Sequence, residues 1–358
     1  MNEPELPGRA PSAASLTEFS SLEIDPLIAD RPAEPRDSSR LIAVSRAGGK
    51  LLHRSFSDLP GFLGPGDMLV LNRSRVWKAR LDAKKPGGGK SEILLMAPAS
   101  ADRLVWTGLC RKVRDGQLLS CPGGVTAECL ARNPDGSFTF RFSAPVDETY
   151  LAASGGVPLP QYILKARARR GVEAPPDEDK YQTVYASQPG SIAAPTAGFH
   201  FTRDLLSRLE AAGVRTEFVT LHIGWGTFRP VRSGDPASHV MMEEECSIAP
   251  EAAAAINSHR ASGGRIVAVG TSSMRTLETF SDETGKVSAG TGKAGIFIMP
   301  GYKFNVASAF ITNLHVPESA PLYMTAAFAG RELLFKAYAE AVRQKYRFYS
   351  YGDSMIIL

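Results

Sequence analysis

The sequence predicts an α/β main domain into which a small all-β barrel is inserted. After residue 200 helical and strand-like patterns alternate, as they do in α/β domains. Between residues 73 and 153 short strand-like runs alternate with turns rich in Gly, Pro and Asp, which is typical of a small barrel. With 358 residues, of which 43% are apolar and 22% charged, the chain is long enough for two domains. We therefore expect a disordered tail at 1–20, a main domain at 21–72 and 154–358, and the barrel at 73–153.

The elements of the main domain have recognisable ends. Thr202 can cap a helix that carries the apolar stripe Leu205, Leu206 and Leu209, and Gly213 ends it. Similar start and stop signals predict two further helices, and short apolar runs bounded by turn residues predict several strands. The expected helices span 202–212, 251–262 and 331–346, and the expected strands span 41–44, 68–71, 214–223, 266–269, 296–299 and 309–312.

Composition narrows the class of protein. The four cysteines form no CxxC pair and have no histidines at zinc spacing, so we expect reduced thiols and no metal site. No run approaches 18 apolar residues, and the Pro-, Ser- and Ala-rich first 20 residues lack the basic start and apolar middle of a signal peptide. We therefore expect a cytoplasmic monomer without a membrane span.

Two basic clusters flank the expected barrel. The first contains Arg73, Arg75, Lys78, Arg80, Lys84, Lys85 and Lys90, and the second contains Lys165, Arg167, Arg169 and Arg170. Charge runs are more often solvated faces, but two clusters around one module favour a polyphosphate partner. The candidate RNA-binding residues are Arg75, Lys78, Arg80, Arg167 and Arg169.

A nearly uncharged stretch, residues 181–202, combines aromatic side chains with Gln, Thr and His. This composition suits either a pocket for a polar organic ligand or a buried turn whose polar groups are satisfied. Polar loops at 222–228, 270–275 and 312–315 follow three expected strands, and ligands of open α/β sheets bind at the carboxyl ends of strands. His200, His222 and His315 fall in these segments. Each alone is more often a structural histidine, and no two have the spacing of metal ligands.

Several long motifs carry a resemblance to a known family. They are PTAGFHFT (195–202), VTLHIGWGTFRPV (219–231), VGTSSMRTLE (269–278), ITNLHVPES (311–319) and YRFYSYGDSMI (346–356), supported by GDMLVLNRSRVWKARL (66–81) and PLPQYI (158–163). Taken in their order along the chain, these motifs resemble those of the S-adenosylmethionine:tRNA ribosyltransferase-isomerase family of the queuosine pathway. The resemblance covers nearly all of the sequence after residue 20.

The resemblance implies an unusual reaction. S-adenosylmethionine would donate its ribosyl carbons to the aminomethyl group of a 7-deazaguanine base in tRNA, giving epoxyqueuosine and releasing adenine and methionine. No metal or further cofactor is implied, because S-adenosylmethionine is a co-substrate. The chemistry needs a base for the ribose proton beside the sulfonium and an acid near adenine.

Site residues follow from the motifs that match. His200, His222 and His315 are expected to include the proton-transfer groups. Asp353 is expected to pair with a cation or a sugar hydroxyl, or else to lie in a C-terminal turn. The expected substrate-binding residues are Tyr181, Gln182, Thr196, Gly198, Gly224, Gly226, Thr227, Thr271, Arg275, Asn313 and Asp353.

The sequence also departs from the family pattern, at Arg73, Gln161, Trp225, Met242 and Glu318. A change of charge or of a titratable group alters a site, so these positions bear on the acceptor more than on the fold. Two alternatives therefore stand beside the main hypothesis. One is a diverged enzyme with another ribosyl acceptor, and the other is a non-catalytic RNA-binding protein.

Overall fold

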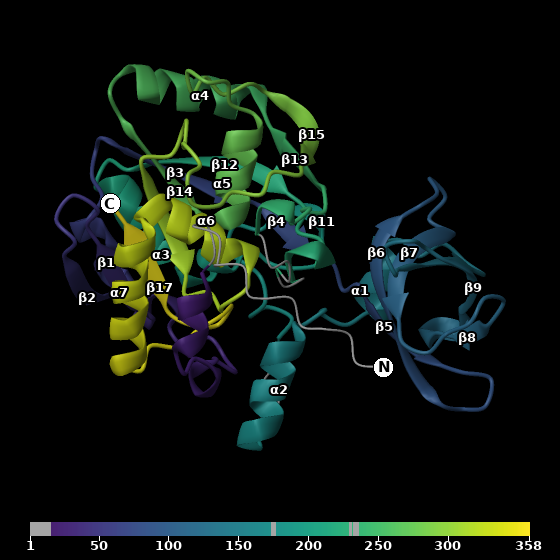
Figure 1. The fold of residues 1–358 in the computed structure, drawn as a ribbon. Coiled ribbons are helices and arrows are strands. Elements are labelled where there is room, and N and C mark those ends of the chain that lie inside the picture. The colour runs from purple at the N-terminus through teal and green to yellow at the C-terminus, as the bar shows by residue number, and fades with distance from the viewer. Residues whose placement is uncertain (1–15, 173–176, 229–230, 232–235) are drawn as a thin grey trace, which may run out of the picture.

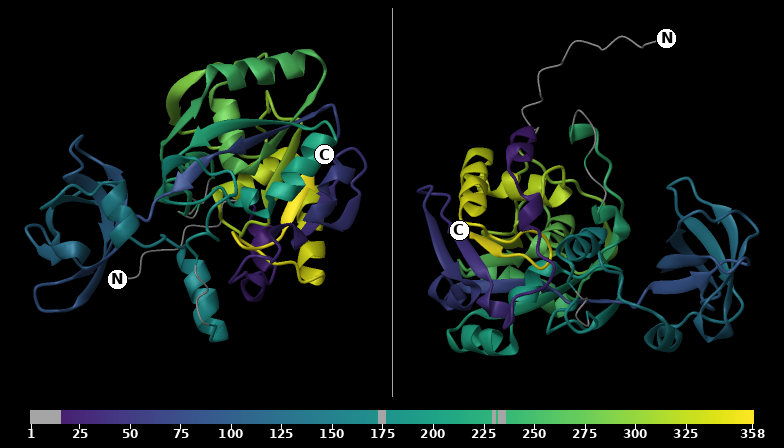
Figure 2. Two further views of the ribbon diagram at one scale, coloured as in Figure 1. Left: turned by 180° about the vertical axis from the view of Figure 1, so that it is seen from behind. Right: turned by 90° about the horizontal axis from the view of Figure 1, so that it is seen from below.

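A computed structural model describes residues 16–172, 177–228, 231 and 236–358 of the chain. The main body is a mixed sheet covered by helices, and a barrel stands beside it at the end of two linkers (Figure 1). The same separation is visible from behind and from below (Figure 2). The predicted α/β main domain with an inserted all-β barrel is therefore confirmed.

The main sheet has nine strands, and its centre is parallel. Strands β12, β3, β14 and β16 run in one direction, whereas β17 runs antiparallel to β16. Their carboxyl ends therefore meet at one edge of the sheet. In spatial order the strands are β15 (Gly290–Ala294), β13 (Glu244–Ile248), β12 (Arg215–Leu221), β3 (Asp67–Asn72), β14 (Arg265–Val269), β16 (Ala309–Asn313), β17 (Ser354–Ile357), β1 (Arg40–Val44) and β2 (Leu51–Ser55).

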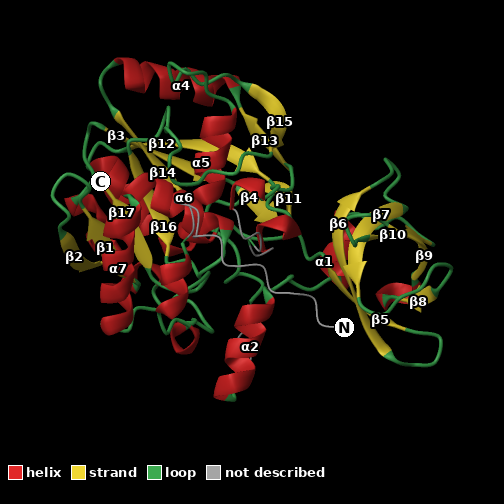
Figure 3. Ribbon diagram, in the orientation of Figure 1, coloured by secondary structure: helices red, strands yellow, loops and turns green. Residues whose placement is uncertain are grey.

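Both faces of this sheet are buried, which explains its continuous apolar strands. In β3, Met68 and Val70 enter one core cluster and Leu69 and Leu71 enter the other, as the two-residue period of a strand requires. Helices α4 (Pro250–Ala261), α5 (Gly270–Thr279), α6 (Ala320–Ala329) and α7 (Arg331–Arg343) contribute to the first cluster, and α3 (Arg203–Ala211) to the second. Figure 3 shows this layering of helices and strands. The cap predicted for α3 is confirmed, because the Thr202 hydroxyl accepts from the Leu205 amide at 3.1 Å.

The barrel is closed by six antiparallel strands around a core that includes Trp106 and Phe140. Two linkers join it to the body, and they pair with each other where Arg80 and Gly156 exchange backbone hydrogen bonds of 3.1 and 2.8 Å. Helix α1 (Glu148–Ser154) closes the barrel and α2 (Gln161–Arg170) follows it, projecting away from the body (Figure 1). In order around the barrel the strands are β10 (Phe138–Phe142), β7 (Val105–Cys110), β6 (Lys90–Pro98), β5 (Arg80–Lys84), β8 (Leu118–Ser120) and β9 (Thr126–Arg132).

Three local expectations are wrong. Residues 16–20 are not a disordered tail, because Leu16 and Phe19 are buried in the main core and Thr17–Ser21 form a 3-10 helix; residues 1–15 lie outside the described residues. Residues 74–76 are not part of the barrel, since β4 (Ser74–Val76) pairs with β11 (Gln188–Ser191) in a separate two-stranded sheet. The run 296–299 is not a strand. It pairs with no strand among the described residues, and its apolar residues are explained by Ile298, which packs into the core.

Candidate functional site

A cavity of about 580 Å³ lies where the parallel strands end. Its wall includes Ile223 after β12, Gly270 and Thr271 after β14, and Asn313 at the end of β16. The barrel completes the wall with Arg80, Glu92, Leu94 and Leu109. The position agrees with the rule that α/β sheets bind ligands beyond the carboxyl ends of their strands. The size fits a drug-sized polar molecule such as a nucleoside derivative.

Asn72 ties the strand ends together beneath the cavity. Its side-chain amide donates to the Leu221 carbonyl at 2.9 Å and to the Ser272 hydroxyl at 3.0 Å. Its carbonyl oxygen accepts from the Leu221 amide at 3.1 Å. A fully buried Asn at the end of β3 thus fixes the ends of β12 and α5 relative to each other.

The first turn of helix α5 faces the cavity. Gly270 begins this helix with a φ of 83°, a conformation that glycine adopts readily, and Thr271 and Ser272 line the cavity after it. Helix N-termini present unpaired amides and a positive dipole. This part of the wall can therefore hold a negatively charged group such as a carboxylate.

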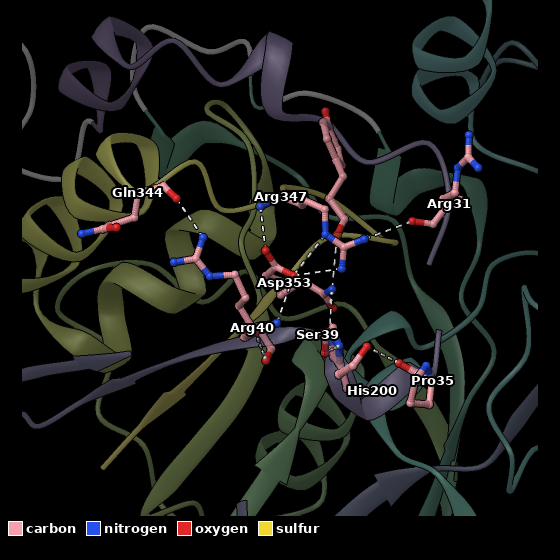
Figure 4. Close-up of polar contacts among 12 residues, drawn as sticks. Arg31, Pro35, Ser39, Arg40, His200, Gln344, Arg347 and Asp353 are labelled. Carbon is pink, nitrogen blue, oxygen red and sulfur yellow. Dashed lines mark hydrogen bonds and ion pairs between the residues drawn. The ribbon is translucent and has the colours of Figure 1, made fainter. Parts of the chain in front are cut away.

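A chain of hydrogen bonds runs from the cavity into the core. The Thr196 hydroxyl donates to the Asn313 side-chain carbonyl at 3.1 Å, and the Asn313 amide donates to the Tyr349 carbonyl at 3.2 Å. Because the same amide lies 3.2 Å from His200 Nε2, that nitrogen must accept. His200 therefore carries its proton on Nδ1 and donates it to Ser39 at 2.7 Å. Figure 4 shows the two side chains next to each other.

His200 is not exposed to the cavity. It is 3% exposed, and both of its ring nitrogens have partners. Burial lowers the pKa of His200 to about 4, which outweighs the opposite effect of Asp353. His200 is therefore a neutral positioning residue for Asn313 and not a group that can reach a substrate.

His315 is the predicted histidine that lines the cavity. Its Nε2 lies 2.7 Å from the Thr312 hydroxyl, and its backbone amide donates to the Tyr338 hydroxyl at 2.8 Å. Burial lowers the pKa of His315 to about 3, so the imidazole is neutral near pH 7. In the neutral tautomer whose Nε2–H donates to the Thr312 hydroxyl, Nδ1 is the nitrogen that can accept a proton.

His222 does not line the cavity. Its ring packs against Gly190, where an added Cβ would lie 2.7 Å from the imidazole. Burial lowers the pKa of His222, although Glu245 opposes the shift. The three predicted histidines are therefore not brought together, and only His315 faces the space where a substrate fits.

Several predicted binding residues are occupied within the protein. Arg275 forms a buried ion pair with Glu244 and also donates to the Ala294 carbonyl. Gln182 exchanges hydrogen bonds of 3.1 and 2.9 Å with the backbone of Val76. Arg275 Nη1 and Nη2 and both polar atoms of the Gln182 amide are therefore bonded within the protein, whereas Arg275 Nε has no hydrogen-bond partner among the described residues.

Asp353 is used in the same way. It is 1% exposed and accepts from the Arg40 amide, the Arg347 amide and the Arg347 guanidinium, at distances from 2.8 to 3.2 Å (Figure 4). The expectation that Asp353 pairs with a cation is therefore met by Arg347 and not by a ligand. Its carboxylate fastens the start of β17 to the segment before it.

The predicted glycines make room for protein atoms. A Cβ on Gly198 would lie 2.0 Å from the Tyr185 hydroxyl, and one on Gly226 would lie 2.8 Å from Met242. The Gly224 amide donates to Glu244 at 2.7 Å. The Thr227 side chain lies outside the described residues. Of the predicted substrate-binding residues, Tyr181, Thr196, Thr271 and Asn313 line the cavity.

The candidate RNA-binding residues fall into two groups. Arg167 is 4% exposed and forms a bidentate pair with Asp177 at 2.6 and 2.8 Å, so its assignment to an RNA surface is wrong. Its role is to hold α2 against the N-terminal segment, because it also donates to the Asp30 carbonyl. The other four lie nearer the surface. Arg75 and Arg169 are exposed, and Lys78 pairs with Glu178. Arg80 lines the cavity, where its guanidinium lies 3.9 Å from the Glu92 carboxylate.

Other cavity residues were not singled out as ligands from the sequence. Gln161, Trp225 and Glu318, noted as departures from the family pattern, all line the cavity, and so do Tyr162, Lys165 and Tyr349. The motifs PLPQYI and YRFYSYGDSMI contain both tyrosines, so the signal was present without an assigned role. Arg73 and Met242 lie elsewhere: Arg73 lies 3.4 Å from the Thr220 hydroxyl, and Met242 packs on Gly226.

Two kinds of feature are absent from the described residues. No helix among them is long and apolar enough to span a membrane. In the same part of the chain, no three His, Cys, Asp or Glu side chains gather as a metal site would require.

Fold and cavity define an α/β protein with an inserted antiparallel barrel and a ligand cavity between the two. Residues 21–357 match the family model described as queuosine biosynthesis protein. The chain therefore belongs to this family.

Relatives cover almost all of the chain. A protein of Symbiobacterium thermophilum named S-adenosylmethionine:tRNA ribosyltransferase-isomerase is 47% identical, over 93% of this chain and 96% of its own. One with the same name from Trichlorobacter lovleyi is 43% identical, over 95% and 99%. The crystal structure of an S-adenosylmethionine tRNA ribosyltransferase from Thermotoga maritima matches with a TM-score of 0.53 and 34% identity, covering 94% of this chain and 98% of that one.

Proposed function

We propose that this protein is an S-adenosylmethionine:tRNA ribosyltransferase-isomerase. It transfers and isomerises the ribosyl group of S-adenosylmethionine onto the 7-aminomethyl-7-deazaguanine base of tRNA, giving epoxyqueuosine-tRNA with release of adenine and methionine. The observation that carries the proposal is the identity of 43–47% to proteins of that name over more than nine-tenths of the chain. The cavity between sheet and barrel is where we place the reaction.

The inner wall of the cavity suits the nucleoside co-substrate. The N-terminus of α5 can accept the methionine carboxylate. At the cavity wall, the Thr196 hydroxyl oxygen and the Asn313 side-chain carbonyl can still accept from ribose hydroxyls, whereas the Asn313 amide is already bonded to Tyr349 and His200. The chain neighbours of these two residues that also line the cavity, Pro195, Ala197 and Thr312, are uncharged, so this part of the wall does not repel a sulfonium ion.

His315 is the proton acceptor that we propose. Removing a proton from the ribose carbon beside the sulfonium gives a neutral ylide, in which the new carbanion balances the sulfonium, and leaves the positive charge on the imidazole. The net charge of the cavity therefore stays constant during the step, although burial disfavours a protonated His315 in the free protein. A neutral imidazole at the cavity wall is the form that this role requires.

Other properties follow as proposals. S-adenosylmethionine serves as co-substrate, and we assign no metal or further cofactor to the reaction. A cytoplasmic monomer is the simplest form of an enzyme that acts on tRNA.

The test is a reconstitution. Purified protein is incubated with S-adenosylmethionine and tRNA carrying 7-aminomethyl-7-deazaguanine, and adenine is quantified by chromatography while the nucleoside is identified by mass spectrometry. We expect adenine and epoxyqueuosine in equal amounts, and none with unmodified tRNA. Adenine release with another acceptor but not with this tRNA would favour the diverged enzyme. RNA binding without adenine release would favour the non-catalytic protein.

Histidine variants assign the chemistry within the same assay. His315→Gln should lower the rate of adenine release by about 100-fold or more, which is the usual contribution of a general base. His222→Gln is the matched control, because His222 does not line the cavity, and it should retain most of the rate. An equal loss in both variants would contradict the role of His315.

A further inference from the structure

Two tyrosines form a stacked pair in the cavity wall. The rings of Tyr162, in the first turn of α2, and Tyr349, before β17, have centroids 3.8 Å apart and planes inclined by 18°. Both line the cavity and both are partly exposed. The Tyr162 hydroxyl is hydrogen-bonded to Ser350, which fixes the ring. The cavity therefore contains a rigid, flat aromatic surface.

The backbone of Tyr349 is strained. Its φ of 70° lies in the left-handed region, which a bulky aromatic residue rarely adopts. The strain is held by hydrogen bonds from the Tyr349 amide to the Leu314 carbonyl at 2.9 Å and from Asn313 to the Tyr349 carbonyl. Strained residues of this kind concentrate where ligands bind. The structure thus maintains this ring position at an energetic cost, next to the Asn313 that contacts Thr196 and His200.

Helix α2 adds polar groups to the same surface. Gln161 and Lys165 line the cavity together with Tyr162, and both are exposed. Lys165 lies three residues after Tyr162 and four after Gln161, so the three side chains share one face of the helix. An aromatic ring, an amide and an ammonium group are therefore presented side by side at the rim of the cavity.

We propose that this surface is the subsite for the acceptor nucleotide of the RNA. The deazaguanine base stacks on the Tyr162–Tyr349 pair, Gln161 contacts the base edge, and Lys165 pairs with a backbone phosphate. This rests on the function proposed above and names the part of the cavity that takes the RNA.

Two observations favour a nucleotide over S-adenosylmethionine at this surface. Lys165 is an exposed cation, and the carboxylate of S-adenosylmethionine, the anionic group with which it could pair, is already assigned to the N-terminus of α5. Helix α2 also projects outward from the body (Figure 1), and its exposed side chains Gln161 and Lys165 are accessible to a ligand as large as an RNA. Unstacked bases in RNA loops are typically recognised by aromatic stacking combined with basic side chains.

The experiment measures two affinities for each variant. One ligand is an anticodon stem-loop RNA carrying 7-aminomethyl-7-deazaguanine, and the other is S-adenosylmethionine alone. Tyr162→Leu should raise the Kd for RNA about tenfold, as loss of one stacking contact does, and leave the Kd for S-adenosylmethionine within about twofold. Lys165→Gln should also weaken RNA binding and reduce its salt slope by about 0.7 to 0.9, the effect of one phosphate contact.

Matched variants decide between the ring and other causes. Tyr162→Phe keeps the ring and loses the bond to Ser350, so RNA binding should be retained; a loss as large as in Tyr162→Leu would overturn the stacking role. Lys336→Gln, a lysine on α7 outside the cavity, should leave the salt slope unchanged. An unchanged Kd for RNA in Tyr162→Leu, or a Kd for S-adenosylmethionine that rises in parallel, would also overturn the proposal.

Two further readouts keep the test decisive. If Tyr162→Leu does not fold, an unchanged salt slope in Lys165→Gln overturns the proposal by itself. If the wild-type protein binds the RNA in these assays but releases no adenine, the proposed function fails while the subsite remains tested.

Discussion

At the scale of single residues, Asn313 controls the protonation of His200. Its amide is directed at the Tyr349 carbonyl and at His200 Nε2, which keeps that nitrogen unprotonated. Asn313→Asp would place a carboxylate there, and an adjacent negative charge favours the imidazolium. We expect the pKa of His200 to rise from about 4 by about one unit or more.

NMR titration of the imidazole resonances measures this change, with His200→Gln identifying the signal. Thr312→Val is the control, because Thr312 contacts His315 and not His200. A His200 pKa that stays near 4 in Asn313→Asp would show that burial alone determines it.

The buried ion pair between Arg275 and Glu244 gives a second prediction. Both side chains are about 95% buried, and removing one leaves the other as a buried charge without this oppositely charged contact. Arg275→Gln and Glu244→Gln should each lower the free energy of unfolding by about 3–5 kcal/mol. The double variant should lose less than the sum, because the two residues act through one contact.

Urea denaturation of the two single variants and the double variant provides the comparison. Strictly additive losses would mean that the pair is not coupled. If Arg275 contacted the substrate, as expected from the sequence, the affinity for S-adenosylmethionine would fall in Arg275→Gln but not in Glu244→Gln.

The sequence predicted which polar residues lie at strand ends but not which of them are already paired. Arg167, Gln182, Arg275 and Asp353 have the residue types of a binding site, yet each is bonded within the protein. Gln182 is bonded to Val76, 106 positions away, and Arg275 to Glu244, 31 away. Such pairing depends on tertiary structure, so composition and spacing do not reveal it.

At the scale of elements, the two linkers of the barrel depend on glycine. A Cβ on Gly155 would lie 1.9 Å from the Lys78 carbonyl, so the linkers could not pair next to Arg80 and Gly156. Gly155→Ala should therefore displace the barrel from the cavity while both domains remain folded. We expect adenine release to fall at least about tenfold, because Arg80 and Glu92 would leave the cavity wall.

Limited proteolysis at the linkers, together with the activity assay, reads out the displacement. Gly87→Ala is the control, because Gly87 has no atom within 4 Å of an added Cβ and no positive φ. Unchanged proteolysis and activity in Gly155→Ala would mean that the linkers tolerate a shift without moving the barrel.

Elements defined by local patterns were predictable, and those defined by distant partners were not. Capping and the apolar stripe predicted α3 almost to its ends, and turn spacing predicted the barrel. The pairing of β4 with β11 joins residues more than 100 positions apart, and the short strands carry no local signal for it. The strand at 41–44 was predicted, but the pairing of β1 with the C-terminal β17, more than 300 positions away, was not.

At the scale of the whole molecule, neutral buried histidines make stability depend on pH. The pKa of His200 lies at about 4 in the folded protein, against an ordinary value of 6.5. The unfolded chain therefore binds this proton below about pH 6.5 while the folded protein does not, and the stabilisation present above that pH is lost as pH falls toward 4. His200 contributes about 3 kcal/mol to this loss, and His315, with its pKa lowered to about 3, acts in the same direction.

Urea denaturation at about pH 7.5, above this window, and at about pH 4.5, near its lower end, measures the effect. The free energy of unfolding should fall as pH decreases, and the fall should be smaller in His200→Gln, since glutamine binds no proton in either state. His222→Gln is the control. Burial also lowers the pKa of His222, but Glu245 opposes the shift, so this variant should reduce the fall less than His200→Gln does. A wild-type free energy that stays constant over this range would contradict the neutral, buried state of His200, and with it the hydrogen-bond chain that fixes Asn313 at the cavity wall.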